Sequence, residues 1–294
     1  MRILVAGAAG FVGRAVVLAC SRAGHEVRGL VRSREQFAGV VSDGGIPFLG
    51  DLLKPESLKR PSRGCDVVIH LAQASHGTIA ERRRVRIEGG RNLVAQAVAA
   101  GVPRCVIGSG YWVYRDNPRI VTEKSPVAPL SISKANFDAE RVVGRKIESV
   151  TLRPGMIYGP GSWFAEMVAG LRAGSYAYIG SGSNFLAPVH WQDAGEAFRT
   201  VCERWVPGET YLVVDDRPAR TKEFADFVSK RLGVAPAGSI SFAQASRDWG
   251  KEIATLNLAS RRASNRKLRG LGWKPRFRTF PTGVPTVLAA MARV

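Results

Sequence analysis

A chain of 294 residues with 45% apolar residues is long enough to bury a substantial core and too apolar to be disordered. Its longest apolar runs fall short of the roughly 20 residues of a membrane span, and no signal peptide opens the chain, so we expect a soluble cytoplasmic protein. The formal net charge of +19 points to anionic partners. Because arginine is spread along the whole chain rather than gathered in a tail, nucleic acid is the less favoured partner and a small-molecule substrate the favoured one.

In chain order, strands alternate with helices through the first half of the chain. The expected strands are Arg2 to Ala6, His25 to Val31, Ile46 to Leu49, Cys65 to Leu71, Arg104 to Gly108, Ser149 to Leu152 and Thr210 to Val214. The expected helices are Phe11 to Arg22, a short one from Pro55, Val85 to Ala100, Ser131 to Val143 and Trp163 to Arg172. Since parallel neighbours need crossover helices, this alternation predicts an α/β fold with a Rossmann-type doubly wound parallel sheet.

The alternation breaks after Pro154, which divides the chain into two predicted parts. We expect residues 1–154 to form an NAD(P)-binding Rossmann domain, to which the strand at 210–214 returns. Residues 155–209 and 215–294 are expected to form a smaller C-terminal substrate-binding lid, with two or three helices after Ala219. The cysteines lie far apart in the sequence, without a C-x-x-C pair or a zinc spacing, so we expect reduced, buried thiols and no metal site.

The loop Gly7-Ala8-Ala9-Gly10-Phe11-Val12-Gly13 connects the first strand to the first helix. Glycine in such a turn lets the backbone approach a pyrophosphate, and the free amides of the helix N-terminus bind the anion. Among 32 glycines this spacing alone is a weak signal, but its place inside a βαβ unit predicts a dinucleotide site. The cofactor residues expected in this loop are Gly7, Ala9, Gly10, Phe11, Val12 and Gly13.

The end of the second strand predicts which dinucleotide binds. A carboxylate there selects the ribose hydroxyls of NAD, but this chain has Arg32, Ser33 and Arg34. The two guanidinium groups can pair with the 2′-phosphate of NADP, and the serine can donate a further hydrogen bond. We therefore expect NADP, with NAD as the alternative.

Further motifs resemble those of the extended short-chain dehydrogenase/reductase family, in its NAD-dependent epimerase/dehydratase branch. They are Gly50-Asp51-Leu52, Asp66 to Ala72, Leu152 to Pro160, Val189 to Asp193 and Leu271 to Pro275. The resemblance implies that Asp51 and Leu52 flank the adenine, and that Leu71, Ala72 and Gln73 line the adenosine and ribose side, with Pro154 also at the cofactor. It also implies a homodimer formed through the helices at 85–100 and 131–143.

The family transfers protons with a tyrosine in a Tyr-x-x-x-Lys motif, aided by a serine or threonine. By resemblance, Lys134 is the lysine and would hold the nicotinamide ribose, but Leu130 stands at the tyrosine position and Gly110 at the serine position. The family also commonly has asparagine where this chain has Arg86. The chain thus resembles an atypical member that lacks the usual acid, whose loss costs roughly 100- to 10,000-fold in rate.

Three interpretations of this departure stay open. The chain is an NADPH-dependent oxidoreductase or epimerase-like enzyme in which Tyr111 or Tyr158 supplies the proton, or it reduces a polarised double bond that solvent protonates. Alternatively it is a non-catalytic NADP-binding scaffold or sensor. The expected substrate wall consists of Gln73, Ser75, Tyr111, Leu130, Met156, Tyr158, Trp163, Phe164 and Phe185. Such a wall suits a partly apolar carbonyl or hydroxyl compound better than a bare sugar, although the arginines would attract a nucleotide-linked one.

Overall fold

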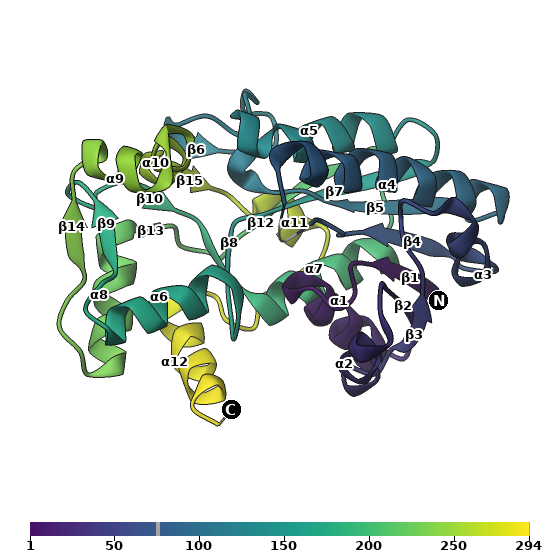
Figure 1. Ribbon diagram of the computed structural model, residues 1–294, viewed down its shortest axis with the longest axis horizontal. Helices are drawn as coiled ribbons and strands as arrows, with labels where there is room; N and C mark the ends of the chain where they lie inside the picture. The colour runs from purple at the N-terminus through teal and green to yellow at the C-terminus, as the bar shows by residue number, and fades with distance from the viewer. Residues whose placement is uncertain (75–76, 294) are drawn as a thin grey trace.

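The computed structural model describes residues 1–74 and 77–293, and its centre is a sheet of seven parallel strands (Figure 1). In spatial order the strands are β12 (Thr210–Val213), β7 (Glu148–Pro154), β5 (Arg104–Gly108), β4 (Val67–His70), β1 (Arg2–Ala6), β2 (Glu26–Val31) and β3 (Ile46–Leu49). The strand order reverses between β1 and β4, which opens a crevice at their carboxyl ends. The predicted doubly wound sheet is confirmed.

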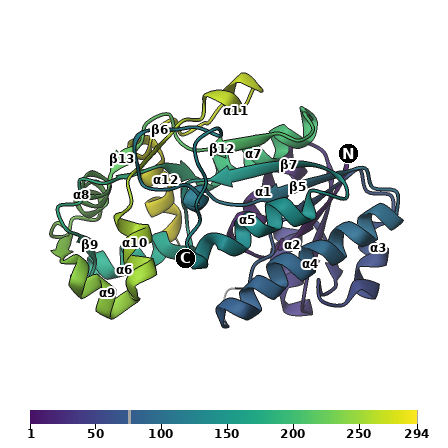
Figure 2. The same ribbon diagram turned by 90° about the horizontal axis from the view of Figure 1, so that it is seen from above.

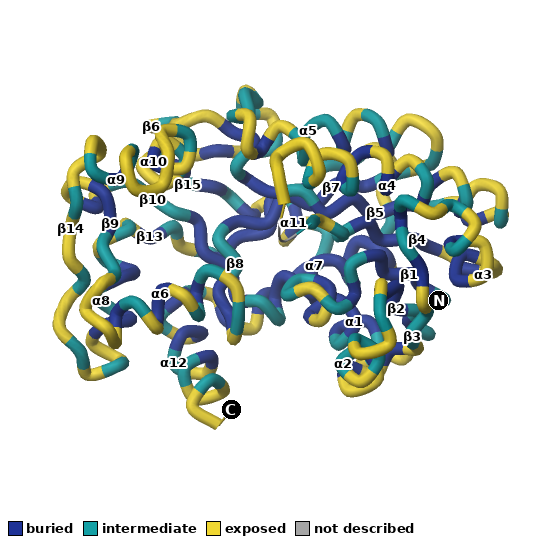
Figure 3. Tube along the Cα trace, in the orientation of Figure 1, coloured by how far each residue is buried: buried dark blue, intermediate teal, exposed yellow. Residues whose placement is uncertain are grey.

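Helices cover both faces of the sheet (Figures 1 and 2). One face carries α1 (Phe11–Arg22) and α7 (Trp191–Glu203), and the other carries α4 (Ile79–Ala99) and α5 (Ser131–Val143). Shorter helices, α2 (Phe37–Ser42) and α3 (Lys59–Ser62), and the 3₁₀ turns η1 (Arg34–Gln36), η2 (Pro55–Leu58) and η3 (Tyr111–Val113) connect the strands. Because both faces are covered, the central strands are buried throughout, which explains why their sequences lack polar alternation (Figure 3).

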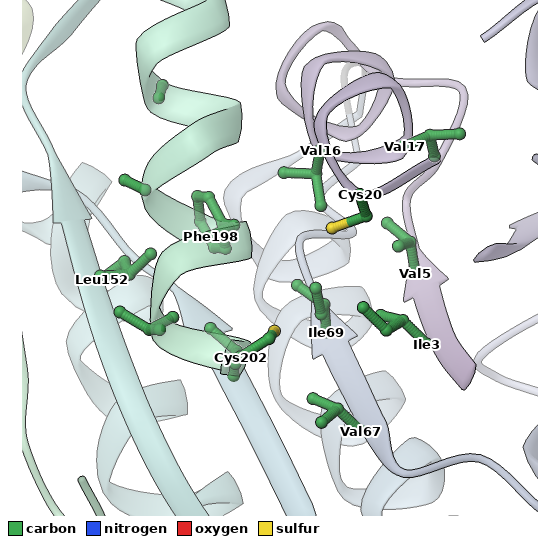
Figure 4. Packing of buried hydrophobic residues seen from close by; sticks show 14 of the residues in the cluster. Ile3, Val5, Val16, Val17, Cys20, Val67, Ile69, Leu152, Phe198 and Cys202 are labelled. Atoms are coloured by element: carbon green, nitrogen blue, oxygen red, sulfur yellow. The ribbon is translucent and has the colours of Figure 1, made fainter. Parts of the chain in front are cut away.

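The core between the sheet and the α1/α7 layer is dry and aliphatic. Figure 4 shows Ile3, Val5 and Ile69 of the sheet facing Cys20 of α1 and Phe198 of α7, and all of these are fully buried. All four cysteines of the chain are free and buried, as predicted. Burial raises the pKa of the Cys20 thiol to about 12, so this cysteine stays a protonated, unreactive core side chain.

The rest of the chain packs beside the carboxyl edge of the sheet as a smaller region. Its helices are α6 (Ser162–Arg172), α8 (Thr221–Leu232), α9 (Phe242–Trp249), α10 (Lys251–Leu258), α11 (Arg266–Gly270) and α12 (Phe280–Met291). Four two-stranded pairs join them: β6 (Asn117–Val121) with β15 (Arg261–Ala263), β8 (Met156–Tyr158) with β11 (Pro188–His190), β9 (Ala177–Ile179) with β14 (Gly238–Ile240), and β10 (Phe185–Leu186) with β13 (Ala219–Arg220).

Two expectations about secondary structure are corrected. Five helices, not two or three, follow Ala219 in the described part of the chain, because several are only five to eight residues long and carry too few turns to show a periodic pattern. The helix expected from Val85 begins at Ile79 instead. There Thr78 Oγ1 accepts a hydrogen bond from the Glu81 amide at 3.2 Å, and Glu81 Oε2 accepts one from the Thr78 amide at 2.7 Å, which forms a capping box. None of the helices in residues 1–74 and 77–293 combines the length with the apolar character that a bilayer crossing requires.

Candidate functional site

The loop after β1 is shaped by close approaches that only glycine tolerates. Gly7 has a φ of 95°, in the left-handed region, and a Cβ there would lie 2.8 Å from the backbone nitrogen of Ala72. A Cβ on Gly13 would lie 1.9 Å from the Gly7 carbonyl oxygen. Gly10 precedes α1 without a side-chain cap, so the first-turn amides stay free for an anion. The cradle therefore fits the pyrophosphate of a dinucleotide.

The segment after β2 presents two free guanidinium groups. Arg32 and Arg34 are exposed, and neither side chain makes a hydrogen bond or ion pair with any residue that the structure describes. Gln36 Oε1 accepts hydrogen bonds from the amides of Arg32, at 3.0 Å, and Ser33, at 3.4 Å, and so fixes the turn. The Ser33 hydroxyl hydrogen-bonds the Glu35 carboxylate and lowers its pKa, so this hydroxyl is already engaged. The two arginines are thus the groups available to a phosphate here.

The predicted adenine contacts lie in the turn after β3. Asp51 Oδ1 accepts a hydrogen bond from the Leu53 amide at 2.9 Å, and the Asp51 amide donates to Ser57 Oγ at 2.9 Å. Leu52 is buried against α4, and a Cβ added to Gly89 of that helix would lie 2.8 Å from the Cβ of Leu52. The turn is therefore rigid, and its backbone holds the Asp51 side chain through the Leu53 amide.

The remaining predicted cofactor residues follow β4 and end β7. The Leu71 amide donates a hydrogen bond of 2.9 Å to the carbonyl oxygen of Ala6, the last residue of β1. Ala72 lies against Gly7, so the loops that follow β1 and β4 meet across the crevice. Gln73 is exposed, and Pro154 is the buried last residue of β7. The structure thus brings the predicted nucleotide residues together along the carboxyl edge of the sheet.

Lys134 lines a groove of about 610 Å³ between α4 and α5. Its ammonium group is 3.2 Å from Asp138 Oδ1, and Asp138 also pairs with Arg83 across the groove. The Lys134 side chain is 58% exposed. Tyr111 lines a different hollow, described below, so the structure does not bring the two catalytic candidates together and their roles stay predictions.

The positions expected to hold the family's tyrosine and serine carry no acid. Leu130 immediately precedes α5 in extended conformation, and its half-buried side chain has no polar atom. Gly110 precedes η3, where a Cβ would lie 2.9 Å from the Trp112 ring. The neighbouring Ser109 hydroxyl is buried and has no hydrogen-bond partner among the described residues.

A cavity of about 340 Å³ opens between the carboxyl edge of the sheet and the smaller region. Tyr111, Trp112 and Met156, which follow β5 and β7, line it on the sheet side. Aromatic and aliphatic side chains of the smaller region form the opposite side, among them Trp163, Tyr176, Tyr178, Trp249 and Ile253. Of the described residues that line this cavity, Glu166 alone carries a formal charge at neutral pH, so the cavity fits a flat or mainly apolar molecule.

The expected substrate wall is thus only partly where the sequence placed it. Tyr111, Met156 and Trp163 line the cavity, but Gln73, Leu130 and Phe164 do not. Phe185 lies instead between the guanidinium groups of Arg220 and Arg262, in a groove outside the cavity. The expectation for Ser75 falls outside the described residues.

Tyr158 also lies away from the cavity, in the aromatic core of the smaller region. It is fully buried, and its hydroxyl donates to Asp215 Oδ2 at 3.5 Å. Tyr158 packs against Phe164 of α6 and Phe224 of α8, and these aromatic contacts hold it in the core. Burial and the nearby Asp215 carboxylate raise the pKa of Tyr158 well above its usual range.

A buried polar network supports the floor of the site beneath β5 and β7. Arg153 of β7 donates to both carboxylate oxygens of Glu140 of α5, at 3.0 and 2.5 Å, and to Tyr114 Oη at 2.6 Å. Arg86 of α4 is fully buried beside it and donates to the carbonyl oxygens of His70 and Gly108, which end β4 and β5. Burial lowers the pKa of Arg86 to about 10. The guanidinium groups thus tie the helices to the carboxyl ends of the strands.

Several residues that shape the cavity went unnoticed in the sequence. Trp112, Trp249 and Ile253 line it, and the guanidinium group of Arg261 lies over the Tyr111 and Trp112 rings. The positions of Trp249, Ile253 and Arg261 depend on how the short elements α9, α10 and β15 pack against distant parts of the chain. The described residues contain no group of three or more histidines, cysteines or carboxylates able to hold a metal ion.

The parallel sheet, its reversal between β1 and β4 and the glycine cradle define a Rossmann-fold, dinucleotide-binding protein. The sequence model of the NAD-dependent epimerase/dehydratase family matches residues 3–213. This chain belongs to that family.

Characterised relatives and solved structures resemble the chain along nearly all of its length. It is 30% identical to the 3-diazoavenalumate denitrifying reductase of a Streptomyces species, over 97% of this chain and 99% of the relative. It is also 30% identical to 4-hydroxy-2-methyl-3-oxo-4-farnesyl-3,4-dihydroquinoline-1-oxide ketoreductase of Stigmatella aurantiaca, over 84% of this chain and 78% of the relative. The human epimerase family protein SDR39U1, solved with NADPH, shares the fold with a TM-score of 0.82 at 21% identity, over 98% and 99% of the two chains. Solved neighbours with NADPH or NAD bound support a nicotinamide dinucleotide cofactor.

Proposed function

We propose that the chain is an NADPH-dependent reductase that reduces a carbonyl, or a double bond conjugated to one, in a mainly apolar or aromatic compound. The observation that carries this proposal is the aromatic cavity that meets the carboxyl edge of the sheet at Tyr111 and Met156, the same edge that carries the glycine cradle. When bound there, NADPH would supply a hydride to the occupant of the cavity. The ketoreductase relative, whose name describes a farnesylated 3-oxo-dihydroquinoline, supports a substrate of this class.

The chain's own residues would bind and orient the reactants. The glycine loop would hold the pyrophosphate, and Arg32 with Arg34 would pair with the 2′-phosphate. The aromatic walls would exclude water around the reacting carbonyl. Leu130 cannot transfer a proton, so we propose that Tyr111 donates it, because Tyr111 is the phenol on the sheet side of the cavity. Lys134 remains a proposed ribose contact, for which its side chain would have to leave Asp138.

The test of this function is a turnover assay. Purified protein with NADPH is presented with aryl ketones, quinones, long-chain 3-oxo compounds and enones, and with nucleotide sugars as a contrasting class. We expect NADPH oxidation with an apolar ketone or enone and none with the nucleotide sugars. NADPH binding without turnover on any of these compounds would contradict the proposal and favour a non-catalytic NADP-binding protein.

Cofactor selectivity gives the first prediction. Replacing Arg32 by alanine should weaken NADP binding about 10- to 100-fold, because a charge-assisted hydrogen bond contributes about 1.5–3 kcal/mol, and should leave NAD binding nearly unchanged. Isothermal titration calorimetry with both dinucleotides measures the change. Arg22→Ala, an exposed arginine at the opposite end of α1, is the matched control. An equal loss for NADP and NAD would remove Arg32 from the phosphate site.

A second prediction concerns self-association. We propose that repulsion between like charges weakens any homodimer formed through α4 and α5. The groove between these helices exposes Arg83, Arg84, Arg141 and Arg145. A two-fold axis would place these arginines against the same arginines of the second copy. Screening should then strengthen the dimer, so its dissociation constant should fall as salt is raised, since the Debye length shrinks from about 10 Å at 0.1 M to about 3 Å at 1 M. Analytical ultracentrifugation measures this. A dimer that salt weakens would show complementary ion pairs instead.

A further inference from the structure

The sheet side of the cavity holds one acid–base group, Tyr111, and its surroundings are unusual. Tyr111 follows β5 at the carboxyl edge of the sheet, where the crevice of the fold lies, and only 2% of its surface is exposed. Burial raises the pKa of Tyr111 to about 12, and the Arg261 guanidinium acts in the opposite direction. A backbone hydrogen bond with Ala187 also acts to lower the pKa. Tyr111 is therefore protonated at neutral pH, and it is one of the residues that line the cavity.

Arg261 is a buried cation without an ion pair. It lies in β15, is 3% exposed, and its guanidinium carbon is 5.7 Å from the centre of the Tyr111 ring. Its Nε donates to the Tyr114 carbonyl at 3.0 Å and its Nη1 to the Leu256 carbonyl at 3.2 Å. Both acceptors are neutral, and no carboxylate among the described residues forms a salt bridge with it. Asp116, the nearest acidic group, accepts a hydrogen bond from the Ser260 amide instead.

A buried, unpaired charge is costly unless something compensates it, and most such arginines pair with carboxylates. Here the compensation comes from two carbonyls and from the faces of Tyr111 and Trp112. The arrangement would gain stability if the neighbouring phenol became negative, because the guanidinium would then have a counter-ion. Lys134 cannot act as the counter-ion of the Tyr111 phenolate from its position, because it is paired with Asp138 in the groove between α4 and α5.

We propose that Tyr111 is the proton donor of the reaction and that Arg261 is the positioning cation that stabilises its phenolate. This inference rests on the proposed reductase function. Bound NADPH would supply the hydride from a C–H bond of its nicotinamide. As the carbonyl carbon gains this hydride, the carbonyl π bond breaks and its electron pair moves to oxygen. The Tyr111 O–H bond then breaks and its proton forms the O–H bond of the product alcohol. The phenolate takes a proton from water once the product has left. Arg261, from the C-terminal part of the chain, thus stabilises the phenolate. In the family this role belongs to the lysine that follows the tyrosine by four residues.

The test measures the phenol directly, so it does not require a known substrate. All six tyrosines are replaced by 3,5-difluorotyrosine, whose more acidic phenol titrates in an accessible range, and ¹⁹F NMR follows each one. The Tyr111 signal is the one missing from Tyr111→Phe. We expect Arg261→Gln to raise the pKa of fluorinated Tyr111 by about one unit or more, a tenfold change in its dissociation constant, and Arg261→Lys to restore most of it.

Tyr176 is the matched internal control. It lines the far wall of the same cavity, and burial alone raises its pKa to about 12. Its titration should be the same in all variants. An unchanged Tyr111 titration in Arg261→Gln, or an equal shift of Tyr111 and Tyr176, would overturn the pairing.

A second measurement keeps the test available where Arg261→Gln does not fold. The ¹⁵Nε resonance of Arg261 should move as Tyr111 titrates in the fluorinated wild-type protein and stay fixed in Tyr111→Phe, which loses a single oxygen. The same movement in both proteins would overturn the proposal.

Turnover assays then separate the role of Tyr111 from the proposed reductase function. With any ketone that is reduced, Tyr111→Phe should lower kcat by about 100- to 10,000-fold while the Kd for NADPH stays unchanged. Full activity of Tyr111→Phe would overturn Tyr111 as donor while leaving the reductase function in place. Absence of NADPH binding in the wild-type protein would overturn the reductase function itself, whatever the tyrosine titration shows.

Discussion

Gly13→Ala is expected to abolish useful NADP binding, with a loss of affinity of at least about 100-fold, equal to about 2.8 kcal/mol. The new Cβ would lie 1.9 Å from the Gly7 carbonyl oxygen and 2.9 Å from the Ala8 Cα, both of them backbone neighbours that cannot rotate away. The start of α1 must therefore move off the loop, and the first-turn amides leave the position of the pyrophosphate. We also expect unfolding free energy to fall by about 1–3 kcal/mol, as in other overpacked sites.

The control is Gly39→Ala, in the short helix α2, where a Cβ meets nothing within 4 Å. Alanine is the better helix former, so this variant should be as stable as the wild-type protein or more stable by up to about 1 kcal/mol, with unchanged NADP affinity. Calorimetric titration and urea denaturation measure both quantities. NADP affinity within about threefold of wild type in Gly13→Ala would mean that the dinucleotide does not use this loop.

The placement of the candidate cofactor residues in the fold was predictable because local forces determine it. The bounds of the first strand, the first helix and the strand Arg104–Gly108 agree with the structure residue for residue, since aliphatic runs and helical spacing report burial directly. The glycine spacing likewise follows from backbone geometry within seven residues, Gly7 to Gly13. The position of Arg32 and Arg34 at the edge of the sheet was predictable because β2 ends where the pattern of the βαβ unit places it.

The substrate half was not predictable in the same way, because contacts between distant segments build it. Trp249 and Ile253 lie on two helices of eight residues that meet at Gly250, and helices this short do not indicate against which distant segment they pack. Arg261 reaches Tyr111 because β15 pairs with β6, across about half of the chain, and the β6 sequence Asn-Pro-Arg-Ile-Val has no strand-like alternation. The motif around Tyr158 predicts a wall residue, yet contacts with Phe164 and Phe224, from distant segments of the chain, place it in the core.

The largest effect on stability is expected at the ion pair beneath the site. Arg153 and Glu140 each have side chains only 7% exposed, so neither charge is solvated by water. Replacing Glu140 by leucine leaves Arg153 as a buried cation without its counter-ion, and breaking a buried pair in this way typically costs about 3–5 kcal/mol. The neighbouring Arg86 loses the same carboxylate, whose charge favours its protonated form. Urea denaturation should show the loss as a lower midpoint with an unchanged slope.

Removing the whole network should be much less harmful than removing one member, and this separates a charge effect from a packing effect. The triple variant Glu140→Leu, Arg153→Met, Tyr114→Phe removes both the unpaired Arg153 charge and the buried Tyr114 hydroxyl to which Arg153 now donates at 2.6 Å. We expect it to recover at least about half of the loss seen in Glu140→Leu, because apolar replacements of buried pairs are often neutral. The part that is not recovered should belong to Arg86, which stays buried with only the carbonyls of His70 and Gly108 as partners. If the triple variant were less stable than Glu140→Leu, packing of these side chains would outweigh their electrostatics, and the floor of the site would be held by shape rather than by charge.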